Sequence, residues 1–163
     1  MIKPNHLLTE VIDPVLSVLG KVNYKLMAGP TTQLMLGTAA QESDLGFYLR
    51  QWPSGPARGL WQMEEATVRD IVDRYLQRQE NAVLRHAVLS FWSGNYDIAE
   101  EISWNMALAC ALARVRYWMV PIPIPEDLED QARYWDIHYN ANEEDEVEEY
   151  IASYNEFVLS NFQ

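Results

Sequence analysis

The feature that most constrains the fold is the apolar stretch over residues 101–119, which is followed by three prolines at alternate positions. A helix over this stretch would be apolar on nearly all sides, and such a helix is normally the buried centre of a globular domain. Pro121, Pro123 and Pro125 cannot continue the helix and predict a stiff, extended connector. The sequence therefore predicts a domain built around residues 101–119.

Apolar residues at spacings of three and four predict further helices on both sides of this centre. The first covers residues 7–19 and is expected to end at Gly20, and a second follows a capping signal at residues 30–32. Gly46 can close the second helix in a left-handed turn. Helical spacing recurs at residues 68–75 and around 82–91, and two amphipathic helices follow the prolines.

Residues 52–59 contain two prolines and two glycines, which predict a loop, with a short extended piece at residues 59–63. The predicted fold class is all-α with a very small extended wall, in one domain over residues 1–163. A lone Cys110 cannot form an internal disulfide, and the N-terminus lacks the continuous apolar segment of a signal peptide. We expect synthesis in a cytoplasm and no membrane insertion, because no apolar run is long enough to cross a bilayer.

The net charge of −12 is concentrated at the C-terminus, where residues 126–163 contain 12 acidic side chains and one basic side chain, Arg133. Without a stripe of Lys and Arg, the chain is not expected to bind nucleic acid. Residues 143–149 are interpreted as a solvated helix face beyond the functional residues. A calcium site or a protein-docking site is the alternative.

Most catalytic arrangements are excluded by residue spacing. His6, His86 and His138 lie far apart and form no metal-binding motif, and Cys110 lies in the most apolar segment, where a thiol is usually inert. We therefore expect no metal and no organic cofactor. Glu42 differs, because it follows Met35, Thr38 and Ala39 on the inward face of its helix. A carboxyl group on a semi-apolar wall has a raised pKa and can donate a proton near neutral pH.

The surroundings of Glu42 resemble a known superfamily. Residues 41–46 (Gln-Glu-Ser-Asp-Leu-Gly), residues 59–63 (Gly-Leu-Trp-Gln-Met) and residues 135–141 (Trp-Asp-Ile-His-Tyr-Asn-Ala) occur in the order found in lytic transglycosylases and goose-type lysozymes. Asn105 resembles the asparagine that opens the buried central helix of that family. Details of the loop, including residues 55–59 and Thr67, look most like the versions of the domain found in tailed phages.

The resemblance implies a lysozyme-like fold and a role for each matched residue. Glu42 matches the general acid, which later acts as base, and Ser43 matches a residue that orients the acid or its substrate. Gln62 and Met63 match the wall beside the cleft, and Tyr139 and Asn140 match groups that close on the acid and the N-acetylmuramic acid ring. The implied partner is a peptidoglycan glycan strand, whose β-1,4 bond to N-acetylglucosamine is cleaved.

Two routes of cleavage remain open. Hydrolysis generally uses a second carboxylate, and Asp44, Glu64 and Glu65 are the nearby candidates, none of them well placed. A single carboxylate fits the transglycosylase route, which forms a 1,6-anhydro ring. The alternative function is a catalytically silent virion structural or wall-binding domain, motivated by the acidity and by Asn142, which stands where the family usually has glycine. A phage virion or a holin would deliver the protein to the cell wall.

Overall fold

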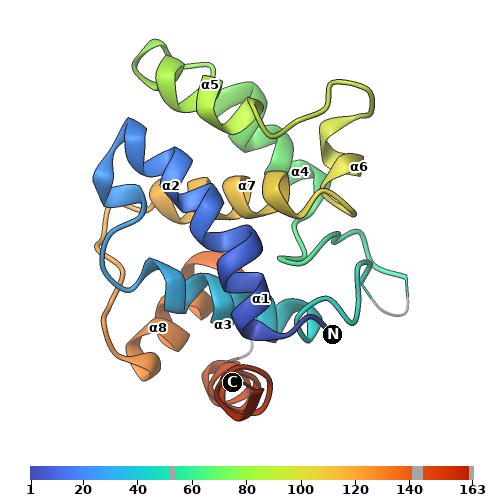
Figure 1. The fold of residues 1–163 in the computed structure, drawn as a ribbon, viewed down its shortest axis with the longest axis vertical. Helices are drawn as coiled ribbons and strands as arrows, with labels where there is room; N and C mark the ends of the chain where they lie inside the picture. Colours follow the sequence, from blue (N-terminus) through green and yellow to red (C-terminus); the bar gives the residue numbers. More distant parts are fainter. Residues whose placement is uncertain (52–53, 141–144, 162–163) are drawn as a thin grey trace.

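The chain folds into an all-helical structure (Figure 1). The computed structural model describes residues 1–51, 54–140 and 145–161. The helices are α1 (Pro4–Leu7), α2 (Asp13–Val22), α3 (Thr31–Ser43), α4 (Glu65–Arg69), α5 (Ala82–Leu89), α6 (Ile98–Glu101), α7 (Met106–Trp118), α8 (Leu128–Trp135) and α9 (Val147–Ser153). Wider helical turns join α1 to α2 over Leu8–Ile12 and extend α4 over Asp70–Tyr75, α8 over Asp136–Asn140 and α9 over Tyr154–Val158.

Backbone pairing between extended residues is almost absent from the described ranges. It is limited to two bridges, Arg50 with Arg58 and Arg58 with Met63. The all-α prediction is therefore confirmed. None of the described helices combines the length and the apolar character needed to cross a bilayer.

The central helix α7 packs against α2, α3 and α5. In Figure 1 it lies between α4, α5 and α6 at one end of the molecule and α3, α8 and the C-terminal helix at the other. The predicted helix over residues 101–119 is interrupted, because α6 ends at Glu101 and α7 begins only at Met106. Asn105 caps α7 by accepting a hydrogen bond from the Leu108 amide at 3.0 Å. The asparagine expected to open the central helix therefore does so.

The ends of the first two long helices differ slightly from the prediction. Helix α2 does not end at Gly20 but continues to Val22, and Asn23 then adopts an extended backbone. Helix α3 ends in a left-handed turn, as predicted, but the turn begins before Gly46. Asp44 and Leu45 both have φ of 51°, and Gly46 follows with φ of 83°.

The acidic C-terminal run is only partly helical. Residues 141–144, including Asn142, Glu143 and Glu144, lie outside the described residues, and α9 begins only at Val147. Asp145, Glu148 and Glu149 are exposed, as expected for a solvated face. Glu146 is half-buried, and its position corrects the expectation that this run lies away from the functional residues, because it lines a hollow beside Glu42.

Candidate active site

Glu42 lies in the last turn of α3, just before the chain reverses. The Asp44 and Leu45 amides donate to Ala40 O and Ala39 O, so the left-handed turn satisfies carbonyls that the helix leaves free. The neighbouring Ala39, Ala40 and Ser43 are buried, whereas Glu42 is half-buried. The helix end therefore holds one carboxyl group at the boundary between core and solvent.

The Glu42 carboxyl group accepts a hydrogen bond from the indole of Trp135 on α8. Trp135 Nε1 lies 2.9 Å from Glu42 Oε1. Burial raises the pKa of Glu42 to about 7, and the negative charge of Glu146 also raises it. The Trp135 hydrogen bond and the positive charge of Arg116 lower this pKa, but burial outweighs them. A carboxyl group with this pKa is partly protonated at neutral pH.

Two adjoining hollows, of about 140 and 270 Å³, meet at Glu42. Both are lined by Glu42, Gln51, Ala57, Gln62 and Asn140. The smaller also contacts Trp135 and Glu146, and the larger contacts Arg116 and Tyr139. The tertiary structure therefore brings together four of the six predicted site residues.

Gln62 reaches the hollow from a tight turn over residues 59–62, where an extended segment was expected. The Gln62 amide and side chain both donate to Gly59 O, at 3.1 and 2.7 Å. Gly59 has φ of 74°, and a Cβ atom there would lie 2.3 Å from the Ile102 carbonyl oxygen. Close contact with the backbone before α7 therefore requires glycine here and bends the segment away from an extended path.

Ser43 and Met63 do not line either of these two hollows. Ser43 is buried, and its hydroxyl lies 2.7 Å from Leu60 O and accepts a hydrogen bond from the Gly46 amide. Met63 is fully buried in the core. Ser43 thus connects the end of α3 to the turn that carries Gln62.

Tyr139 and Asn140 follow α8 and form the opposite wall. The Tyr139 hydroxyl donates to Trp61 O at 2.6 Å, which joins this wall to the turn over residues 59–62. The Arg116 guanidinium lies 4.1 Å from the Tyr139 ring centroid and donates to Tyr139 O. Ala141, the third residue of the matched element, lies outside the described residues.

Several lining residues had no assigned role in the sequence analysis. Trp135 belongs to the matched segment 135–141, and its place in that segment was the signal the sequence offered for it. Arg116 is one of only two cations in the apolar stretch 101–119, so its charge was also a usable signal. Gln51 and Glu146 carry no local signal, because the fold alone brings them to Glu42.

The acidic residues that could supply a second carboxylate differ in whether they line a hollow together with Glu42. Glu65 forms an ion pair with Arg69 at 3.5 Å. Asp44 lines neither hollow, and burial and the charge of Glu156 raise its pKa. Glu64 lines the larger hollow and Glu146 the smaller one. Among the carboxylates that the structure describes, only Glu64 and Glu146 therefore share one of these two hollows with Glu42.

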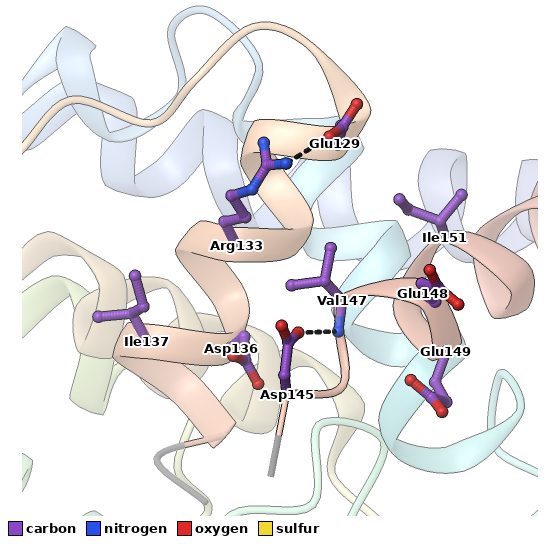
Figure 2. A pocket seen from close by; sticks show the side chains of 9 residues that line it. All are labelled: Glu129, Arg133, Asp136, Ile137, Asp145, Val147, Glu148, Glu149 and Ile151. Carbon is purple, nitrogen blue, oxygen red and sulfur yellow. Dashed lines mark hydrogen bonds and ion pairs between the residues drawn. The ribbon is translucent and has the colours of Figure 1, made fainter. Parts of the chain in front are cut away.

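A hollow of about 680 Å³ lies elsewhere on the described surface, between α8 with its extension and α9 (Figure 2). It is lined by Asp136, Asp145, Glu148 and Glu149, and Arg133 at its rim is paired with Glu129. Glu42 does not line it. Asp145, Glu148 and Glu149 at this hollow are exposed, whereas Glu42 is half-buried at the end of α3.

Other chemistry finds little support in the described part of the chain. No group of three or more His, Cys, Asp or Glu side chains there could hold a metal ion. Cys110 is fully buried, and burial raises the pKa of its thiol. Comparison with protein-family models, with curated proteins and with solved structures returned no match.

Proposed function

We propose that this chain is a peptidoglycan-cleaving muramidase that acts as a lytic transglycosylase on the β-1,4 bond between N-acetylmuramic acid and N-acetylglucosamine. One observation carries the proposal. Glu42 combines a pKa of about 7 with a position where two hollows meet. A proton donor beside a groove is what cleavage of a glycosidic bond requires.

In the proposed reaction Glu42 gives its proton to the glycosidic oxygen as the bond from that oxygen to C1 of muramic acid breaks. The muramic 6-hydroxyl attacks C1, and its proton passes to the Glu42 carboxylate, which restores the acid. Trp135 and Arg116 assist the first transfer, because the hydrogen bond and the positive charge favour the carboxylate that remains after the proton is given up. No cofactor is needed.

Gln62, Tyr139 and Asn140 are proposed to hold the glycan strand, with Ser43 and Met63 supporting them from behind. Polar amides at the hollow suit the hydroxyl and acetamido groups of such a strand. The protein reaches the wall with a virion or through a holin, as the resemblance to tailed-phage domains implies.

Product analysis tests this proposal directly. Purified sacculi digested with the protein are expected to release muropeptides with 1,6-anhydromuramic ends, detected by mass spectrometry. Glu42→Gln should reduce release by about 10²- to 10⁴-fold, because the amide cannot donate the proton. Glu100→Gln, an exposed acid on α6, is the matched control and should leave release unchanged.

Two other outcomes would lead to different conclusions. Reducing muramic ends would indicate hydrolysis and would direct attention to Glu64 and Glu146 as the second carboxylate. Failure of the folded wild-type protein to release any muropeptide would support the catalytically silent wall-binding or virion domain instead.

A further inference from the structure

Arg114 is a buried cation whose charge is not balanced by a carboxylate. Its side chain is 3% exposed and extends from the middle of α7. Nε donates to Leu26 O at 2.7 Å and Nη2 to Lys25 O at 3.2 Å, whereas Nη1 has no hydrogen-bond partner among the described residues. Arg114 takes part in none of the ion pairs among the described residues. Since burying an unpaired charge is costly, such a side chain indicates that an anion is needed nearby.

This arginine remains charged under physiological conditions. Burial lowers its pKa to about 10, still well above neutral pH. The neighbouring ionisable groups that act on it are Tyr134, Cys110 and Tyr117, all neutral near pH 7. Apart from the Leu26 and Lys25 carbonyl oxygens, the guanidinium faces the Trp118 ring, whose centroid lies 5.6 Å from the guanidinium carbon.

Arg114 lines a cavity of about 520 Å³ that is separate from the candidate active site. The cavity shares no lining residue with the two hollows at Glu42. Trp118, Ile122 and Tyr134 form an apolar side, and Lys25 adds a second cation. The cavity therefore combines positive charge with an apolar wall.

The N-terminus of α3 adds to the positive potential at the same cavity. This 13-residue helix begins at Thr31, and both Pro30 and Thr31 line the cavity. Pro30 at the cap position has no side chain that could accept from the first helical amides, and the Thr31 hydroxyl donates to Ala28 O. The positive end of the helix dipole thus points toward the cavity without a capping acceptor.

We propose that this cavity binds an organic anion, with a carboxylate or phosphate group near Arg114, Lys25 and the first amides of α3 and an aromatic or aliphatic body against Trp118 and Ile122. The buried arginine, the second cation and the helix end all favour negative charge, and the apolar wall favours a ligand larger than an inorganic ion. This ligand site is independent of the proposed glycan cleavage.

Titration calorimetry with the full chain tests the proposal, using phenyl phosphate, benzoate and, as the uncharged probe, benzyl alcohol. We expect saturable one-to-one binding of at least one anion and none of the alcohol. Comparing phenyl phosphate with benzoate shows which anionic group the site prefers. Arg114→Met should weaken binding by about 10- to 100-fold, as expected for loss of a charge-assisted hydrogen bond.

Arg114 also donates hydrogen bonds to the Lys25 and Leu26 carbonyl oxygens, so replacing it can disturb folding as well as binding. Two variants at exposed positions that line the cavity, each with a matched control, separate these effects. Lys25→Met and Ile122→Glu change exposed residues that line the cavity, and each should weaken anion binding about fivefold or more. Lys21→Met and Ile137→Glu make the same changes on exposed residues outside the cavity and should leave affinity unchanged. Absence of anion binding by the wild type, or equal affinity in all four surface variants, would overturn the proposal.

Discussion

Glu42 is half-buried and Glu101 is buried, and the protein shifts their pKa values in opposite directions. Glu101 is 1% exposed and accepts hydrogen bonds from the Ser93 amide, the Ser93 hydroxyl and Asn105 Nδ2, at 2.9, 2.5 and 2.7 Å. Burial alone would raise its pKa, but these donors outweigh burial and lower it. Glu42 accepts from Trp135, and burial dominates, so its pKa rises to about 7.

The comparison shows that burial by itself does not produce an acid near neutral pH. The number of donors directed at the carboxylate decides which form is favoured. Glu101 joins the turn at Ser93 to Asn105, the cap of α7, and is a structural anion. Glu42 is left with few donors at a hollow, which is the setting of a proton donor.

The largest effect on stability is expected at Glu101. Glu101→Gln should lower the free energy of unfolding by about 2–4 kcal/mol, because an amide cannot accept from all three donors and leaves buried groups unsatisfied. Urea denaturation measures the loss. The neighbouring Glu100→Gln should change stability by less than about 0.5 kcal/mol. If the Glu101 variant were as stable as the wild type, the contrast between the two carboxylates would be lost.

The dependence of stability on pH should have opposite signs for the two residues. The folded-state pKa of Glu42 is raised from 4.5 to about 7, so its contribution to stability is fully present below pH 4.5 and is lost as pH rises through 7. Partial solvent contact reduces the loss to about 1–3 kcal/mol. The pKa of Glu101 is lowered, so its contribution is present above its unfolded value and is lost as pH falls through the folded value.

Urea denaturation of wild type, Glu42→Gln and Glu101→Gln across pH 4 to 8 measures these trends. The stability of the wild type relative to Glu42→Gln should fall with rising pH, and its stability relative to Glu101→Gln should increase. Parallel curves for the two variants would contradict opposite pKa shifts.

A smaller effect is expected from removing the one donor to Glu42. Trp135→Phe deletes the N–H group that favours the carboxylate, so the pKa of Glu42 should rise further. Because the protonated form donates, the alkaline limb of the cleavage rate profile should move to higher pH by up to about one unit. Trp92→Phe removes an indole that donates to Tyr96 O and should not move the profile. An unchanged limb in Trp135→Phe would mean that Glu42 does not set it.

The smallest effect concerns Glu146. Its negative charge raises the pKa of Glu42, so Glu146→Gln should move the alkaline limb to lower pH by about a few tenths of a unit, since a partly screened charge acts weakly. Glu148→Gln changes an exposed acid two residues away that does not line the hollow. Equal shifts in both variants would indicate a general effect of net charge rather than a specific contact.

Much of the helical framework could be predicted from the sequence. Periodic apolar residues indicated α2, α3, α5 and the two C-terminal helices, because helix amphipathicity is a local property of the chain. Glu42 was also identifiable, since its spacing from Met35 and Ala39 placed it on the inward face of one helix. The capping role of Asn105 is local as well, because it involves the amide of Leu108 only three residues away.

Only the tertiary structure decided what surrounds these residues. Gly59 is required at its turn because the Ile102 carbonyl oxygen lies close to it, and the Ser43 hydroxyl donates to Leu60 O and does not line a hollow. Neither contact can be predicted from the spacing of residues along the chain. The Trp135 indole that binds Glu42 is 93 residues away in the chain. The pKa values of Glu42 and Glu101 shift in opposite directions because different hydrogen-bond donors, distant in sequence or located in loops, surround the two carboxyl groups. A periodic sequence pattern specifies only which face of a helix a carboxyl group occupies, and not the groups that pack around it.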